Sequence, residues 1–117
     1  MSAPEGKQVG DVNTFWNWGG RYVGYRLSDD LFCYDGRQVG YFAEGDEVYG
    51  CSGEYMGEVR QGNRLIRNLA KKKWTRGALI PRAMKSSPGH RDVTAKEMLD
   101  GYEDFPVSPE RIVLNIS

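Results

Sequence analysis

The chain has 117 residues and a mass of 13.2 kDa, the size of one small domain with a single modest core. Its 15 glycines and 12% aromatic residues favour short strands and tight turns. Counted with glycine and without tyrosine, about 46% of the residues are apolar, an ordinary globular value that argues against a disordered chain. The net charge is zero, because 16 basic residues balance 16 acidic ones, so no overall charge points to a partner.

Several classes of protein are disfavoured by simple counts. No stretch approaches the roughly 18 apolar residues of a membrane span, and residues 1–6 lack the basic start of a secretory signal. We therefore expect a cytoplasmic protein without membrane contact. Two cysteines, Cys33 and Cys51, are too few for a disulfide scaffold and are expected as free thiols. With a single histidine, the usual zinc patterns are excluded, and we expect no cofactor and no metal.

An internal repeat follows an N-terminal tail over residues 1–13. A glycine-containing motif occurs at residues 20–25, 36–41 and 53–58, and each copy is followed by a polar tip and an apolar pair. The apolar pairs begin at residues 15, 31, 48 and 65, a spacing of 16 or 17 residues. Such a period predicts one supersecondary unit copied along the chain.

Each unit is predicted to be a β-hairpin. Gly-Asp and Gly-Asn at two of the tips favour chain reversal, and the opening glycines mark the reversals between hairpins. The inner glycines lie within strands, which indicates close backbone approach or a bend. Strict alternation places Val23 and Tyr25 on one face and Tyr22, Gly24 and Arg26 on the other. The predicted core is Phe15, Trp16, Val23, Leu31, Phe32, Val39, Val48, Met56, Leu65 and Ile66.

The repeat resembles a known family. The run from Leu31 through Gly36-Arg37-Gln38-Val39-Gly40-Tyr41 to Phe42, with Gly53-Glu54-Tyr55-Met56-Gly57-Glu58, is similar to the small bacterial four-fold β-flower proteins. The resemblance implies four hairpins around a pseudo-fourfold axis, and it carries no catalytic residue because the family has no established activity. Residues 14–68, the hairpin-repeat domain, hold only three glycine-marked first strands. The missing strand is expected from the C-terminal run 111–116 or from another segment.

The rest of the chain is divided by its charge. Residues 1–59 carry a net −6, residues 60–91 a net +10 without any acid, and residues 92–117 a net −4. Residues 69–93, rich in proline and glycine, are predicted to be a basic irregular arm. Residues 94–117 are predicted to form a short helix, starting at the capping-box spacing of Thr94 and Glu97, and a C-terminal strand on the same domain.

The arm is the first candidate binding region. Clustered bases beside an aromatic residue favour contact with nucleic acid or another acidic partner. The candidate residues are Arg64, Arg67, Lys71, Lys72, Lys73, Trp74 and Arg76. The alternatives are that the arm lies across acidic hairpins of its own chain or of a sister chain in a homo-oligomer, or that it is a solvated loop.

The repeated tyrosines are the second candidate. Tyrosines around an axis, with an acid nearby, could frame a site for a sugar, a peptide or a small cation, and the alternative is core packing. The candidate ligand-binding residues are Tyr22, Tyr25, Tyr41, Tyr55 and Glu58. His90 lies between serines and Asp92, but neighbours in one loop rarely form a catalytic triad.

These patterns together predict a mostly β protein. We expect about four hairpins, a basic arm, one short helix and a C-terminal strand. The expected function is that of a non-enzymatic binding or scaffold domain for an unidentified ligand or protein partner, with the site at the axial end of the hairpins or on the arm. The alternatives are nucleic-acid binding through residues 60–91 and an oligomeric structural protein held by acidic–basic complementarity.

Overall fold

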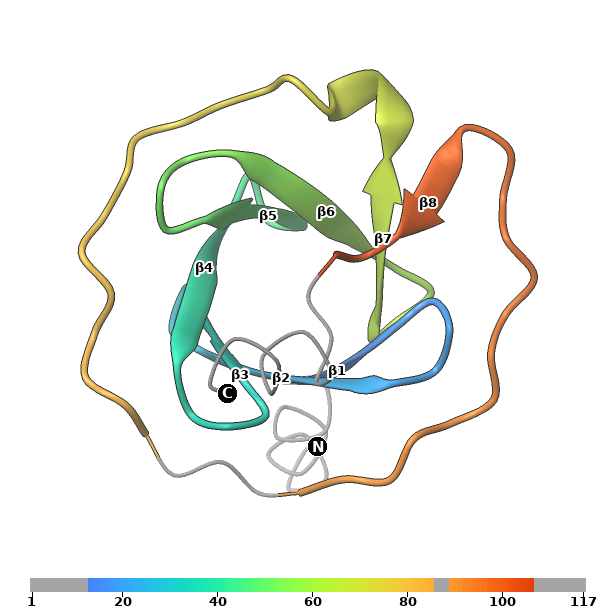
Figure 1. The fold of residues 1–117 in the computed structure, drawn as a ribbon, viewed down its shortest axis with the longest axis horizontal. Coiled ribbons are helices and arrows are strands. Elements are labelled where there is room, and N and C mark those ends of the chain that lie inside the picture. Colours follow the sequence, from blue (N-terminus) through green and yellow to red (C-terminus); the bar gives the residue numbers. More distant parts are fainter. Residues whose placement is uncertain (1–12, 86–88, 107–117) are drawn as a thin grey trace, which may run out of the picture.

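The fold is a sheet of short strands that closes on itself (Figure 1). The computed structural model describes residues 13–85 and 89–106. Each of the first seven strands pairs antiparallel with the next, and β1 also pairs in parallel with β7, which completes a ring. The predicted mostly β fold is confirmed. The strands of the ring are β1 (Thr14–Asn17), β2 (Tyr22–Leu27), β3 (Asp30–Cys33), β4 (Gln38–Ala43), β5 (Glu47–Gly50), β6 (Tyr55–Arg60) and β7 (Arg64–Asn68).

Two kinds of turn alternate around the ring. The first kind closes the tips of the pairs β2–β3, β4–β5 and β6–β7, where Ser28, Glu44 and Gln61 have φ angles of 58°, 51° and 52°. The second kind joins one strand pair to the next, and glycines take its φ angles of 91° to 99°. These glycines are Gly20, Gly36 and Gly53. Both kinds lie where the repeat predicted chain reversals.

A bulge interrupts β2, β4 and β6 at the inner glycine of each. In β2, Val23 and Gly24 together face one position of β1, and β4 and β6 repeat this irregularity at the same place in the motif. A Cβ at Gly24 would lie only 1.9 Å from the carbonyl oxygen of Phe32 in β3, so β2 can approach β3 this closely only with a residue that has no side chain. The predicted close backbone approach is therefore confirmed here.

The bulges make the predicted strand faces wrong. Tyr25 was expected on the same face of the strand as Val23. Its ring instead stacks on Phe32 with 5.6 Å between centroids, while Val23 packs in the central core. Arg26 was expected on the opposite face, yet its guanidinium lies 4.3 Å from the ring centroid of Phe42, which belongs to that core. One extra residue per strand reverses the faces of the residues that follow it.

The core fills the centre of the ring. All four apolar pairs contribute their first residue to it, and their second residues lie outside this cluster. Of the predicted core, Trp16 is only half-buried and Val39 is a partly buried neighbour of the cluster. The cluster consists of Phe15, Val23, Leu31, Phe42, Val48, Met56, Leu65 and Phe105.

The chain beyond β7 encircles the ring. After the short 3-10 helix η1 (Leu69–Lys71) it runs around the outside in a segment that we name the belt, residues 72–85 and 89–101 (Figure 1). The belt leads to β8 (Tyr102–Asp104), which pairs antiparallel with β7. The strand predicted over residues 111–116 and the tail predicted over residues 1–13 lie outside the described residues, except Asn13.

The predicted short helix from Thr94 to Leu99 is wrong, because these residues have no helical structure. The backbone N–H of Lys96 donates to the carbonyl oxygen of Trp18 at 3.0 Å, and the Trp18 indole donates to the carbonyl oxygen of Glu97 at 2.9 Å. Backbone groups that a helix would pair internally are thus bound to the ring. No helix among the described residues is long and apolar enough to cross a membrane.

Replacing Leu31 or Leu65 by Ala should lower the free energy of unfolding by about 2–5 kcal/mol, since each fully buried side chain would leave a cavity. Denaturant titration measures this loss. The control is Leu27→Ala, because Leu27 is 48% exposed and its truncation should cost less than about 1 kcal/mol. Equal losses at Leu27 and Leu31 would contradict the central core.

Candidate functional site

The tyrosines predicted to bind a ligand do not converge on the centre of the ring. The Tyr22 ring packs against the ring of His90 with 4.9 Å between centroids, and the Tyr41 hydroxyl donates to the carbonyl oxygen of Gly77 at 2.6 Å. His90 and Gly77 belong to the belt, so both tyrosines lie on the outer side of the ring. Of the predicted ligand set, the structure brings together only Tyr55 and Glu58.

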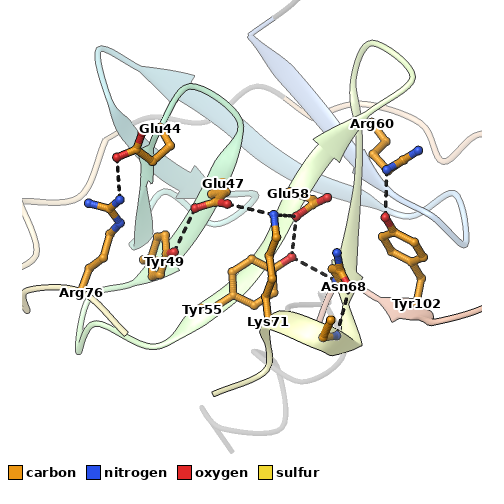
Figure 2. Close-up of polar contacts among 11 residues, drawn as sticks. Glu44, Glu47, Tyr49, Tyr55, Glu58, Arg60, Asn68, Lys71, Arg76 and Tyr102 are labelled. Atoms are coloured by element: carbon orange, nitrogen blue, oxygen red, sulfur yellow. Dashed lines mark hydrogen bonds and ion pairs between the residues drawn. The ribbon is translucent and has the colours of Figure 1, made fainter. Parts of the chain in front are cut away.

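A charged network joins Tyr55 and Glu58 to Lys71 (Figure 2). The Tyr55 hydroxyl and the Lys71 ammonium both donate to Oε1 of Glu58, each at 2.9 Å. The same ammonium donates to Oε2 of Glu47 at 2.9 Å. The Lys71 side chain therefore bridges two carboxylates that come from neighbouring strands.

Sheet register explains why these carboxylates meet. Glu47 and Glu58 are directly opposite each other in the β5–β6 ladder, where two like charges would repel. Glu58 follows the bulge at Gly57, which reverses the faces of the residues after it. Lys71 ends η1, whose first turn is fixed because the Asn68 side chain accepts from the backbone N–H of Ala70 at 3.0 Å.

The network shifts the ionisation of its members. Burial alone would raise the pKa of Glu47, but hydrogen bonds from Lys71 and Tyr49 and the nearby positive charge outweigh it and hold that pKa below its ordinary value. Burial likewise opposes the charge on Lys71, yet its bonds to Glu58 and Glu47 raise its pKa. Burial and the bond to Glu58 raise the pKa of Tyr55. Glu47 and Lys71 are thus held charged and Tyr55 neutral.

The network lines an open groove at the tips of β4–β5 and β6–β7. The groove has a volume of about 440 Å³ and is bounded by Glu44, Asp46, Glu47, Glu58, Val59, Arg60, Gln61 and Lys71. An adjoining hollow of about 520 Å³ shares Glu44 and Glu47 and adds the rings of Tyr49 and Trp74. The Lys71 Nζ lies 5.1 Å from the Trp74 ring centroid, within cation–π range.

Most of the basic residues predicted to contact nucleic acid are engaged within this chain. Arg64 is only 7% exposed and donates to the carbonyl oxygen of Trp18 at 3.1 Å. Arg67 and Lys72 both face Glu103, with N···O distances of 3.1 Å and 3.8 Å.

The next residues along the arm differ in their exposure. Arg76 pairs with Glu44 at 2.6 Å, which ties the belt to a hairpin tip. Lys73 is exposed, and Trp74 keeps 47% of its surface exposed while its ring packs edge-on against Tyr55. The arm thus lies across acidic residues of its own chain, which is one of the alternatives that the charge pattern left open.

Sequence reasoning missed Glu47 and Tyr49. The signals available were the acidic pair at the second hairpin tip and the basic run 24 residues later, but nothing local shows that Glu47 and Lys71 meet. His90 packs against Trp16, and the Asp92 carboxylate accepts from the backbone N–H of Tyr22 at 3.0 Å, so these two side chains have structural contacts. In the described part of the chain, no three His, Cys, Asp or Glu side chains gather as a metal site.

The stability of the protein should fall in acid partly through Glu47. Because its folded-state pKa lies below the ordinary 4.5, its contribution is complete above that pH and is lost as the pH falls through the lowered value. Denaturant unfolding from neutral pH to about pH 3 should therefore show a steeper loss for the wild type than for Glu47→Gln. Parallel curves for the two proteins would contradict this role.

The comparisons with known proteins bear on the family. A family model described as 4-fold beta flower protein matches residues 9–111, which include the ring, the belt and β8. No curated protein and no solved structure matches the chain. The match extends well beyond the hairpin repeat on which the resemblance was based. This chain belongs to the 4-fold beta flower family.

Proposed function

We propose that the chain is a non-enzymatic binding module whose groove at the hairpin tips holds an organic cation, an amine or a guanidinium. The observation that carries this proposal is the position of the Lys71 ammonium, bound by two carboxylates and facing two aromatic rings beside an open hollow. Carboxylates and aromatic faces together are the groups by which proteins recognise ammonium ions. In the structure, the ammonium group of Lys71 itself occupies that site.

The charge balance of the groove supports a cationic ligand. Four carboxylates line it, against two cations, Arg60 and Lys71, while Arg76 from the adjoining hollow pairs with one of the four, Glu44. Arg60 donates to the Tyr102 hydroxyl at 2.9 Å, so part of its hydrogen-bonding capacity is directed away from the carboxylates. Asp46 has no ion pair with any residue that the structure describes. A ligand cation that replaces the Lys71 ammonium would therefore enter a site with an excess of negative charge.

The two other functions receive less support. Nucleic-acid binding through residues 60–91 would need basic side chains that are free to contact phosphates. The side chains of Arg64, Arg67 and Arg76 instead bind groups of this chain. Assembly by acidic–basic complementarity would need charges that these same contacts already satisfy within one chain. Both stay predictions, and Lys73 with Trp74 is the part of the arm most open to a partner.

We also infer that the ring has a pseudo-fourfold design in which residues 101–105 take the place of the missing first strand. Gly101 has a φ of 82° and precedes β8, as the turn glycines precede β2, β4 and β6. β8 pairs antiparallel with β7, and Phe105 joins the central cluster. The Asp104 carboxylate accepts from the backbone N–H groups of Trp18 and Gly19 at 2.8 and 2.9 Å, which connects this segment to the turn after β1.

Removing the resident ammonium tests the proposed function. Lys71→Met keeps most of the aliphatic side chain but leaves Glu47 and Glu58 without their cation. We expect this variant to bind n-butylammonium at least about tenfold more tightly than the wild type, since the site is vacated. NMR titration of the backbone amides of β5 and β6 measures the affinity and locates the site.

The control variant is Lys73→Met, which makes the same substitution at an exposed lysine two residues away and should leave the affinity at the wild-type level. Adding Glu58→Gln to Lys71→Met should abolish the gain. The proposal fails if Lys71→Met binds the probe no better than Lys73→Met, or if the gain survives the loss of the Glu58 charge.

A further inference from the structure

The three turn glycines of the ring all contact the belt, and they do so in the same way. The carbonyl oxygens of Gly20, Gly36 and Gly53 accept hydrogen bonds of 2.7, 3.0 and 2.8 Å from backbone N–H groups of the belt. The donors, in the same order, are Val93, Lys85 and Arg76. Because the belt runs around the ring in the direction opposite to the hairpins, its first donor meets the last glycine.

Each of these contacts also depends on the absence of a side chain. A Cβ on Gly20, Gly36 or Gly53 would lie 2.0, 2.1 or 2.2 Å from a belt carbonyl oxygen, much closer than atoms can approach. The tip glycines Gly45 and Gly62 have positive φ angles as well, but nothing lies within 4 Å of a Cβ placed on them. The turn glycines therefore form three equivalent subsites for a passing backbone, separate from the groove.

The belt binds these subsites through its backbone more than through its side chains. Its apolar side chains are largely exposed, 90% for Ile80 and 65% for Met84. Further backbone bonds join Leu79 to the carbonyl oxygen of Cys51 at 2.8 Å and Arg82 to the Gln38 side chain at 2.8 Å. Contacts to a backbone recognise an extended chain with little regard to its sequence.

Charge adds a preference to this backbone recognition. The Arg82 guanidinium pairs with Asp30, whose side chain is mostly buried, and Arg76 pairs with Glu44. Asp30 and Glu44, the acids that these two arginines face, belong to the ring, and residues 72–85 of the belt contain no acid. We name the outer side of the ring that the belt contacts the rim. An extended segment with basic residues at the positions of Arg76 and Arg82 fits the rim better than a neutral or acidic segment does.

We propose that the rim of the ring, with Gly36 and Gly53 as its anchoring subsites, is a binding site for an extended basic polypeptide segment, and that the belt is its resident intramolecular ligand. Since the belt buries little apolar surface, it detaches at a lower free energy than the ring unfolds. A segment of another chain binds the rim when the belt is detached. The tethered belt competes with it at a high effective concentration.

The test weakens the belt in the full-length protein and supplies its sequence as a peptide. Leu79→Pro/Lys85→Pro removes two belt N–H donors, those to Cys51 and Gly36, and leaves every ring residue unchanged. A fluorescein-labelled peptide with the sequence of residues 73–85 is the probe, and fluorescence anisotropy measures its binding. We expect the double-proline variant to bind it at least about tenfold more tightly than the wild type, because the competing belt is less often docked.

Two matched controls separate the rim from general loosening. Leu79→Ala/Lys85→Ala truncates the same side chains but keeps the N–H donors, so it should bind the peptide like the wild type. In the double-proline background, Gly36→Ala should abolish peptide binding, whereas Gly45→Ala, at a glycine with open space, should preserve it. The peptide that carries Arg82→Glu should bind more weakly than the unchanged peptide.

The near-ultraviolet circular dichroism signal of the buried aromatic residues shows whether each variant keeps its ring. If the double-proline variant loses this signal, Lys85→Pro alone, which spares the Leu79 contact, gives the same comparison. The proposal is overturned if proline and alanine variants bind the peptide equally, or if Gly36→Ala and Gly45→Ala affect binding alike. Neither result bears on the groove, whose test uses a different probe and different residues.

Discussion

The approach of one strand backbone to its neighbour at the inner glycines is the constraint on which this structure depends. It lies beside a bulge in β2, β4 and β6, and each bulge reverses the faces of the residues that follow it. In β4, Phe42 thereby enters the core, while Tyr41 contacts the belt. In β6, Val59 packs against the core and Glu58 reaches Lys71. The face on which Glu58 lies thus depends on the bulge at Gly57, although Gly57 itself does not line the groove.

The uneven charge of the sequence has its counterpart in the way the belt lies on the ring. Exposed pairs such as Arg76–Glu44 each contribute about 0–1 kcal/mol, so they orient the belt more than they stabilise the fold. The Lys71 bridge is different, because its three charged groups are largely shielded and two of them would otherwise repel across the β5–β6 ladder. The Lys71 bridge therefore offsets the repulsion between Glu47 and Glu58, which the sheet register places opposite each other.

The sequence allowed the strands and turns to be predicted because both depend on short-range patterns. Glycines at fixed offsets and apolar pairs at a constant period located β1 to β7 and most of the core. The strand faces were wrong because a bulge is a backbone event that leaves the residue types unchanged, as at Val23. The helix expected at Thr94 was wrong because Lys96 binds the ring, a contact between residues 78 apart in the chain. For the same reason, the meeting of Glu47 and Lys71 had no local signal.

The groove and the rim are built from different chemistry, yet they join at one point of the chain. Lys71 ends η1, and the belt begins with the next residue. A few residues on, the backbone N–H of Tyr55 donates to the carbonyl oxygen of Trp74 at 3.0 Å, so the strand that carries Glu58 also holds the start of the belt. Holding Lys71 between its carboxylates therefore favours a docked belt, because it fixes the position from which the belt departs. In the two proposals, a cation that replaced this ammonium would act on the part of the chain that lies along the rim, so both proposed sites share one structural link.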